Sequence, residues 1–349
     1  MPVFSETRLR DFARSLLEAG GVPAEKATIV ASSLVLANFC GYDSHGVMRI
    51  PFYVANIESG RLQPDADLRI ERETGAVVVG DGGWGMGQVI CRQMMERLVQ
   101  KASVLGVASG TLRRTGHIGR LGEYAEWAAE RRFASILCCN NHGAAQRVAP
   151  LGGKRPRLGT NPICIGMPGG ADGPFVLDFS TSATAEGKVR VKKIAGEPVP
   201  PGWLLDAEGR PTTDPNTLYA DPPGSILPMG GAQAYKGFGL AFMIEMLCGG
   251  LSGGDTARPN PPKPVGNCVF LVVIDPKHFA GMEHLEREVR HLEAYVRGVP
   301  RIDGVEEILL PGDPERRSVG QRQRDGIPID ERNWSALTEL AERLGVPTP

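Results

Sequence analysis

The sequence has no excess of charge of either sign. Its 349 residues carry 39 Lys and Arg against 40 Asp and Glu, a formal net charge of −1. Proteins that bind nucleic acid or an anionic membrane surface by electrostatics need a basic excess, so we expect neither partner. The sequence also lacks an uncharged apolar run of about 18 residues and an apolar segment near its start. We therefore expect neither a membrane-spanning helix nor a secretory signal.

Metal-binding and disulfide patterns are missing as well. The seven cysteines are odd in number and include no C-x-x-C pair, and none of the six histidines stands in H-E-x-x-H. The spacings of these residues match no zinc site. These absences predict a reduced, cytoplasmic protein without a bound metal.

Glycine and proline, in contrast, are abundant, with 45 and 28 residues. This predicts many tight turns and pockets lined by backbone. The length suits about two domains, and an apolar fraction of 42% is ordinary for a globular chain.

The first 60 residues show helical periodicity, and the composition changes near residue 75. Beyond this point strands and helices alternate, which predicts an α/β layer. The expected elements are a strand at 77–79, a helix at 87–105, a strand at 107–112, a helix at 121–131 and a strand at 134–139. Residues 159–232 are rich in turn-forming residues, with short strand candidates at 163–167 and 175–177. A helix at 237–251, a surface loop at 258–264, a strand at 268–274 and a helix at 281–296 with a solvated face follow.

A glycine string follows the first of these strands. Gly80-Asp-Gly82-Gly-Trp-Gly85 matches the G-x-G-x-x-G pattern of a Rossmann dinucleotide site. That site also needs an acidic residue about 20 positions later, at the end of the second strand, but here the strand runs into Arg113 and Arg114. The sequence therefore favours a structural glycine turn.

The segment Asp43-Ser-His45-Gly-Val-Met-Arg49 gathers a hydroxyl, an imidazole and a guanidinium within seven residues. On one helical turn His45 and Arg49 would face the same way. An imidazole can pass a proton near neutral pH, and a guanidinium can hold a carboxylate through two hydrogen bonds, which suits a 2-hydroxy or 2-oxo acid. An ordinary alternative has comparable weight: Ser44 caps a helix, His45 is a surface residue and Arg49 forms an ion pair.

A second candidate imidazole, His117, lies between glycines at the end of a strand and the start of a helix. Such a position lets a ligand approach the backbone, and the helix N-terminus favours an anion. A capping histidine at a helix entry is the alternative. His142 also follows a strand, without an assigned role, whereas the remaining histidines are expected to be solvated: His278, His284 and His291.

Three further loop segments carry groups that can bind ribose and pyrophosphate, although each could be a structural turn. They are Gly159-Thr-Asn161-Pro162, Leu177-Asp178-Phe-Ser180-Thr-Ser182 and Lys236-Gly-Phe-Gly239. No G-x-S-x-G or Walker motif is present, so acyl hydrolases and nucleoside triphosphatases gain no support.

Taken together, these blocks resemble the malate/L-lactate/L-sulfolactate dehydrogenase family of the non-Rossmann kind. The matching segments lie in order over nearly the whole chain: 43–49, 116–119, 158–162, 177–182, 185–188, 235–240 and 310–313. Segments 198–202, 211–213, 250–254 and 323–329 are most similar to bacterial hydroxycarboxylate dehydrogenases.

The resemblance implies an α/β fold in which a non-Rossmann dinucleotide-binding α/β domain is inserted into a mixed α/β domain built from both chain ends. We expect approximate parts at 1–75, 76–260 and 261–349, the first and last completing one domain. It also implies a homodimer and NAD as cofactor, with NADP possible. The acidic Asp313 and Glu315 favour NAD, although Pro-Gly-Asp313-Pro-Glu315 replaces the more common Pro-Gly-Glu and leaves open which carboxylate meets the ribose. Whether Arg120 or Asp313 lies near that ribose is also open.

By the same resemblance His45 or His117 exchanges the proton, with Ser44 beside His45. Arg49 would clamp the substrate carboxylate, and Asp178 would orient the imidazole or the nicotinamide. The residues implied to contact the cofactor are His45, Gly119, Arg120, Leu121, Thr160, Asn161, Val176, Leu177, Asp178, Phe179, Ser180, Lys236, Asn267, Gly312, Asp313, Pro314 and Glu315.

The expected reaction is hydride transfer between a nicotinamide and C2 of a small 2-hydroxy or 2-oxo acid. Reduction of a cyclic imino acid is the alternative within the family. A nucleotide-binding protein that has lost catalysis is the alternative from another class.

Overall fold

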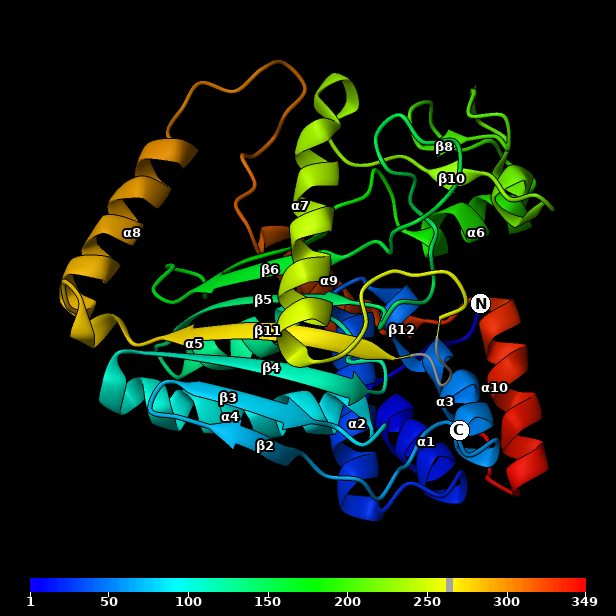
Figure 1. Ribbon diagram of the computed structural model, residues 1–349, viewed down its shortest axis with the longest axis horizontal. Coiled ribbons are helices and arrows are strands. Elements are labelled where there is room, and N and C mark those ends of the chain that lie inside the picture. The colour runs from blue at the N-terminus through cyan, green and yellow to red at the C-terminus, as the bar shows by residue number, and fades with distance from the viewer. Residues whose placement is uncertain (262–265) are drawn as a thin grey trace.

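The computed structural model describes residues 1–261 and 266–349. Part of the proline-rich segment 258–264, which the sequence predicts to be a surface loop, lies outside the described residues. The chain forms a mixed α/β structure, as predicted, around a seven-stranded sheet (Figure 1).

The strand order of this sheet does not follow the order of the strands along the chain. In space the strands are β2 (Arg69–Glu73), β3 (Val77–Asp81), β4 (Val107–Thr115), β11 (Asn267–Ile274), β5 (Ala134–Asn140), β6 (Pro162–Met167) and β7 (Phe175–Ser180). Only β3 and β4 pair in parallel, joined by the crossover helix α4 (Gly87–Leu105). β11 enters from far along the chain and pairs antiparallel with both β4 and β5.

Each face of the sheet is covered by different helices. α4 and α5 (Gly122–Glu130) pack on one face, where Leu112, Leu137 and Val269 contribute to a buried apolar cluster. α7 (Tyr235–Glu245) lies on the opposite face, with Cys138 and Ile244 in a second cluster (Figure 1). A π-helical turn, η5 (Met246–Gly250), continues α7.

The two chain ends share a core of their own. Apolar residues from positions 4–89 and 327–341 form one buried cluster, and the short strand β1 (Val3–Phe4) pairs with β12 (Ile327–Pro328). Its helices are α1 (Glu6–Ala19), α2 (Ala24–Phe39), α3 (Ile50–Glu58), α9 (Asp313–Asp325) and α10 (Glu331–Leu344). This agrees with a domain built from both ends. The predicted start of its C-terminal part at residue 261, however, would include β11, which the structure places in the middle of the central sheet.

A small lobe lies between β7 and α7 along the chain. It holds α6 (Glu186–Ala195), a 3₁₀ turn, η3 (Pro215–Tyr219), and a three-stranded sheet of β8 (Leu204–Leu205), β9 (Pro211–Thr212) and β10 (Ser225–Ile226). Val189, Leu204 and Ile226 are buried at its centre. Strands of two residues carry too little periodicity to be predicted from sequence.

The helix α8 (Met282–Arg297) stands apart from the sheet at one edge of the molecule (Figure 1). Its solvated face was predicted, but apolar side chains are exposed too: Tyr295 is 83% exposed and Leu292 64%. The preceding short turn is η6 (Pro276–His278). Among the described residues, none of the helices has the length and apolar character needed to cross a membrane.

The glycine string of residues 80–85 is a packed turn, which confirms the structural interpretation. A Cβ on Gly82 would lie 3.0 Å from the carbonyl oxygen of Arg114, and one on Gly85 2.9 Å from that of Ala66. The neighbouring backbone therefore packs closely against these glycines, and α4 begins only at Gly87.

Candidate functional site

Two histidines from distant parts of the sequence stack against each other at the junction of the sheet and the chain-end helices. His45 ends the 3₁₀ turn η1 (Asp43–His45), and His117 follows β4. Their ring centroids are 5.4 Å apart and their planes differ by 27°. The sequence singled out both residues, and the tertiary structure brings them together.

The segment around His45 does not form the single helical turn that was expected. η1 and the next 3₁₀ turn, η2 (Val47–Arg49), are separated by Gly46 in an extended conformation. A Cβ on Gly46 would lie 2.2 Å from Oδ1 of Asn38, so the segment needs glycine here. Arg49 nevertheless returns to the first turn, because its Nε donates to the carbonyl oxygen of Ser44 at 2.6 Å.

A buried hydrogen-bond chain orients His117. Nε2 of Gln88 donates to the hydroxyl of Tyr53 at 2.9 Å, and this hydroxyl lies 2.8 Å from Nδ1 of His117. The tyrosine oxygen can accept from both Gln88 and an Nδ1–H group, and in this tautomer Nε2 of a neutral His117 has a free lone pair that can accept a proton. Tyr53 and Gln88 were missed in the sequence. The position of Tyr53, four residues after Arg49, is the signal that could have found it.

His45 has a different partner. Its Nδ1 lies 3.0 Å from Oγ of Ser44, the preceding residue. Ser44 therefore contacts an imidazole rather than capping a helix. Each imidazole thus has one nitrogen engaged by a hydroxyl.

Both imidazoles are held in the neutral form at pH 7. Burial lowers the pKa of His45 to about 3, and the charges of Arg49 and Arg120 act in the same direction. Burial and the charge of Arg49 also lower the pKa of His117 well below its usual range. A neutral imidazole is the form that can accept a proton.

Asp178 lies in β7, and its carboxylate is hydrogen-bonded to the backbone at the start of α5. Its Oδ2 accepts a hydrogen bond from the backbone amide of Gly122 at 2.7 Å. Among the described residues it forms no hydrogen bond with either imidazole, so the predicted orientation of a catalytic histidine by Asp178 finds no contact in the structure. Burial raises the pKa of this carboxyl to about 6, against the charge of Arg120.

Arg120 is buried in the loop between Gly119 and Leu121. It forms an ion pair with Glu126, and its guanidinium lies 5.6 Å from the ring centre of Tyr42. Its Nε and Nη1 atoms are buried and have no hydrogen-bond partner among the described residues. Unsatisfied buried donors of this kind are costly, so this position fits an acceptor from a bound group.

The first turn of α9 lies beside β7. The backbone amide of Val176 donates to the carbonyl oxygen of Pro311 at 3.4 Å, and the Tyr42 hydroxyl donates to Oε1 of Glu315 at 2.8 Å. Gly312 and Pro314 belong to this turn. The Tyr42 hydroxyl also lies 3.5 Å from the carbonyl oxygen of Asp178. Predicted cofactor residues from two distant segments are thus neighbours.

The two acidic residues of α9 have different surroundings. Asp313 binds the backbone amide of Leu310 at 2.7 Å and the guanidinium groups of Arg297 and Arg316. These contacts lower its pKa although burial opposes them. The carboxylate of Asp313 is therefore occupied by the protein itself, whereas Glu315 contacts the Tyr42 hydroxyl.

Another group of predicted cofactor residues meets at the end of β7. The backbone amide of Thr181 donates to the carbonyl oxygen of Thr160 at 3.0 Å, next to Ser180. Lys236 is exposed in the first turn of α7. This turn packs closely on the same loop: a Cβ on Gly237 would lie 2.9 Å from the Thr181 carbonyl oxygen. Leu177 is 42% exposed and Phe179 half-buried on β7.

Asn161 and Asn267 were also predicted to contact the cofactor, and both side chains are buried and hydrogen-bonded to other parts of the protein. Nδ2 of Asn161 donates to Oε1 of Glu245 at 2.9 Å. Asn267 accepts from the backbone amide of Ile118 at 3.1 Å and donates to the carbonyl oxygen of Asn140 at 2.8 Å. These amides fix the strand ends and the His117 loop, while Oδ1 of Asn161 is buried without a hydrogen-bond partner among the described residues.

Glu245 on α7 accepts hydrogen bonds from several of these buried groups, and its removal is expected to destabilise the fold. Its carboxylate accepts from Asn161, from Nδ2 of Asn140 at 2.7 Å and from the backbone amide of Ala257 at 3.0 Å. Glu245→Leu removes three hydrogen bonds to a carboxylate and leaves the Ala257 amide without a partner, while the two asparagine amides keep one bond each. It is expected to lower the free energy of unfolding by about 3–5 kcal/mol. Urea unfolding measures this. Glu339→Leu, at an exposed position of α10, is the control, and an equal loss in both variants would contradict the assignment.

His142 lies apart from the stacked pair. Its Nδ1 is 3.2 Å from Oδ2 of Asp255, and its ring packs at 5.0 Å from that of Trp84. Burial lowers its pKa although Asp255 opposes the shift. Among the described residues no cluster of side chains suits a metal ion.

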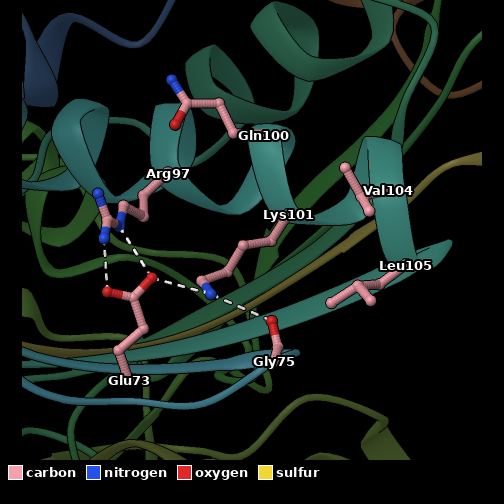
Figure 2. Close-up of a pocket in the computed structure, with 7 residues that line it drawn as sticks. All are labelled: Glu73, Gly75, Arg97, Gln100, Lys101, Val104 and Leu105. Atoms are coloured by element: carbon pink, nitrogen blue, oxygen red, sulfur yellow. Dashed lines mark hydrogen bonds and ion pairs between the residues drawn. The ribbon is translucent and has the colours of Figure 1, made fainter.

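A pocket of about 390 Å³ lies at the other end of α4. Figure 2 shows that Arg97 and Lys101 on this helix both point to Glu73, and Lys101 also reaches the carbonyl oxygen of Gly75. Their charges are therefore compensated within the pocket wall. About ten residues of helix, or roughly 15 Å, separate it from Gly87, which packs on His117.

Comparison with known proteins identifies the family of this chain. The sequence model of the family described as malate/L-lactate dehydrogenase matches residues 4–338. The chain belongs to this family. It is 37% identical over 348 residues to hydroxycarboxylate dehydrogenase B of Escherichia coli strain K12, covering 99% of this chain and 95% of that protein. The resemblance inferred from the sequence blocks is thereby confirmed.

Two solved structures extend the comparison of this family member. The structure of malate dehydrogenase from Pyrococcus horikoshii matches with a TM-score of 0.90 at 32% identity, over 100% of this chain and 97% of that one. That of Δ1-piperideine-2-carboxylate reductase from Pseudomonas syringae matches with a TM-score of 0.84 at 31% identity, over 98% and 100%. The chain is thus a member of an oxidoreductase family of hydroxycarboxylate dehydrogenases.

Proposed function

We propose that this protein is an NAD-dependent dehydrogenase that interconverts a small 2-hydroxy acid and the corresponding 2-oxo acid. The observation that carries the proposal is the hydrogen-bond chain from Gln88 through Tyr53 to His117, beside the guanidinium of Arg49. It supplies an oriented imidazole for a proton and a cation for a carboxylate.

His117 exchanges the proton at the C2 oxygen in this proposal. In the oxidation direction its neutral ring accepts the hydroxyl proton, and the Tyr53 hydroxyl holds the opposite nitrogen so that the ring cannot turn away. In the reduction direction the protonated ring returns this proton to the developing alkoxide.

Arg49 binds the substrate carboxylate. Its Nε is fixed on the Ser44 carbonyl oxygen, and its terminal nitrogens form no hydrogen bond with the described residues. These nitrogens are a planar pair of donors suited to a carboxylate. Fixing the carboxylate also fixes which face of C2 is presented to the hydride donor.

The residues between His45 and α9 would hold the dinucleotide. Arg120, with two unsatisfied buried donors, Asp178, Tyr42 and Glu315 form a continuous series from the imidazoles to the first turn of α9. When bound there, a nicotinamide supplies and accepts the hydride. The Glu315 carboxylate supports NAD, because an acidic group favours a free ribose 2′-hydroxyl over a 2′-phosphate.

The depressed pKa of the imidazoles predicts the pH dependence of oxidation. Because the pKa of His117 lies well below its usual range, the proton-accepting form persists as the pH falls. We expect kcat/KM for 2-hydroxy acid oxidation to stay level from pH 8 to about pH 5.5, and kcat/KM for reduction to fall as pH rises. Initial rates in constant-ionic-strength buffers measure both. An acid limb centred near pH 6.5 for oxidation would show that the catalytic imidazole titrates normally.

The proposed activity is tested by following NADH and NADPH oxidation by absorbance. The substrates are pyruvate, oxaloacetate, 2-oxoglutarate, phenylpyruvate, hydroxypyruvate and a cyclic imino acid. Turnover of a 2-oxo acid with NADH supports the proposal, and turnover only with NADPH would overturn the assignment of the cofactor. Binding of cofactor without turnover of any substrate would favour a nucleotide-binding protein without catalysis.

Reduction of a cyclic imino acid is the second candidate. The 3.0 Å contact between Ser44 and His45 supports it, because it places a second hydroxyl–imidazole pair beside the first. The fold neighbour named Δ1-piperideine-2-carboxylate reductase adds to this support. Activity on the cyclic imino acid alone would make it the preferred function.

We further propose a cytoplasmic homodimer. All seven cysteines are free and buried, as expected for a reducing compartment. Exposed apolar side chains on α8 and the segment after it, including Tyr295 and Ile302 at 78% exposure, support contact with a second copy. Sedimentation equilibrium should give twice the mass of the chain. Ile302→Asp is expected to shift the protein toward monomer, and a wild-type monomer at micromolar concentration would contradict the proposal.

A further inference from the structure

The first turn of α6 packs directly on the turn that carries the Ser44–His45 pair. A Cβ on Gly187 would lie 3.1 Å from Cβ of Ser44, so glycine permits this close approach. The small lobe therefore reaches the candidate active site through the start of α6.

Charged side chains of both signs lie at this turn: Glu186 and Arg190 from α6, and Arg147 from an earlier loop. Glu186 accepts a hydrogen bond from Nη2 of Arg190 at 3.1 Å, and its other oxygen lies 3.5 Å from Nε of Arg147. The hydroxyl of Tyr219, from η3, is buried beside Arg190. One carboxylate thus faces two guanidinium groups and a hydroxyl that can still donate.

These charged side chains act on the carboxylate-binding residue. After burial and Tyr53, the charges of Arg190 and Glu186 are the groups that influence the pKa of Arg49. The Glu186 carboxylate contacts Arg147 and Arg190 but forms no ion pair with Arg49 among the described residues, so three guanidinium groups near the site face one carboxylate, while both imidazoles are neutral. A substrate with one negative charge leaves part of this positive charge uncompensated, and a substrate with two compensates it.

We infer that Arg190, with Arg147, binds a second anionic group at the distal end of the substrate, so that the preferred substrates are dianionic 2-oxo and 2-hydroxy acids. The inference rests on the proposed function and assigns its substrate class. Glu186 has the role of a competitor: it holds the two arginines in place and must share them when the distal group arrives. A charged group bound by a guanidinium is favoured by both the charge and the hydrogen bonds.

The test compares oxaloacetate with 2-oxobutyrate, a monoanion of similar length. Arg190→Gln is expected to lower kcat/KM for oxaloacetate by about 10-fold to 100-fold, the loss of a hydrogen bond to a charged group, and to change kcat/KM for 2-oxobutyrate by less than about 3-fold. Glu186→Gln should act in the opposite direction and raise the ratio of the two values, because the competing charge is removed. Lys192→Gln, the same change of charge on the same helix, is the control; Lys192 pairs with Glu197 on the surface.

The outcomes separate this inference from the proposed function. Opposite shifts of the oxaloacetate to 2-oxobutyrate ratio in Arg190→Gln and Glu186→Gln support the inference, and the pair cannot arise from a common loss of folding. Equal losses on both substrates, or a ratio unchanged in both variants, overturn the inference and leave the proposed dehydrogenase activity standing. Absence of turnover with every 2-oxo acid overturns the proposed function and the inference with it.

Discussion

His117→Asn is expected to lower kcat for 2-oxo acid reduction by about 10²-fold to 10⁴-fold, the usual contribution of a positioned general acid. Asparagine keeps a polar group near the Tyr53 hydroxyl, 2.8 Å from Nδ1 of the wild-type imidazole, but cannot exchange a proton. The dissociation constant of NADH should change by less than about 3-fold, because His117 acts on the substrate oxygen. Stopped-flow rates and a fluorescence titration measure the two effects.

His45→Asn is the matched comparison, since the two rings stack at 5.4 Å and both are partly buried. We expect a smaller loss of kcat, about 10-fold or less, because Ser44 rather than a buried tyrosine relay holds its Nδ1. The reverse order of the two losses would move the proton exchange to His45. Near-normal turnover in both variants would remove the acid–base assignment altogether.

Arg49→Lys is expected to lower kcat/KM for the 2-oxo acid by about 100-fold or more while leaving NADH binding unchanged. A lysine keeps the charge but presents a point donor in place of the planar fork, and it cannot also bridge to the Ser44 carbonyl oxygen in the geometry of Nε. Most of the effect should be in KM, because the guanidinium binds the carboxylate in the ground state as well as in the transition state.

Arg10→Lys provides the control for this substitution. Arg10 pairs with Glu6 on the exposed side of α1, so its replacement should alter neither kcat nor KM. Circular dichroism and thermal unfolding verify that Arg49→Lys keeps its fold. A variant that is folded and has unchanged KM would show that the carboxylate binds elsewhere.

The secondary structure of the α/β part is largely determined by local sequence. The helix predicted at 87–105 is α4 with the same bounds, and the strands predicted at 107–112 and 134–139 lie within β4 and β5. Long apolar periodicity and flanking glycines make such elements predictable. The two-residue strands β8, β9 and β10 have no comparable pattern and depend on their tertiary neighbours.

Strand order was not predictable in the same way. β11 inserts between β4 and β5 more than 120 residues after the second of them, and its place is decided by pairing along both edges. For the same reason the boundary expected at residue 261 separates β11 from the sheet to which it belongs. Local patterning does not contain information on which strands become neighbours.

In the candidate site, too, the residue types could be predicted from the sequence, whereas their contacts depend on the tertiary structure. By itself the sequence determined the residue types and the family: His45, Arg49, His117 and the loop blocks that match the malate/L-lactate dehydrogenase family. Only the tertiary structure decided that the two imidazoles stack and that Tyr53 and Gln88 orient one of them. It also decided that the side chains of Asn161 and Asn267 are buried and hydrogen-bonded to other parts of the protein. The physical reason is that periodicity and spacing report local conformation, whereas burial, hydrogen-bond partners and pKa depend on residues that are distant in sequence and adjacent in space.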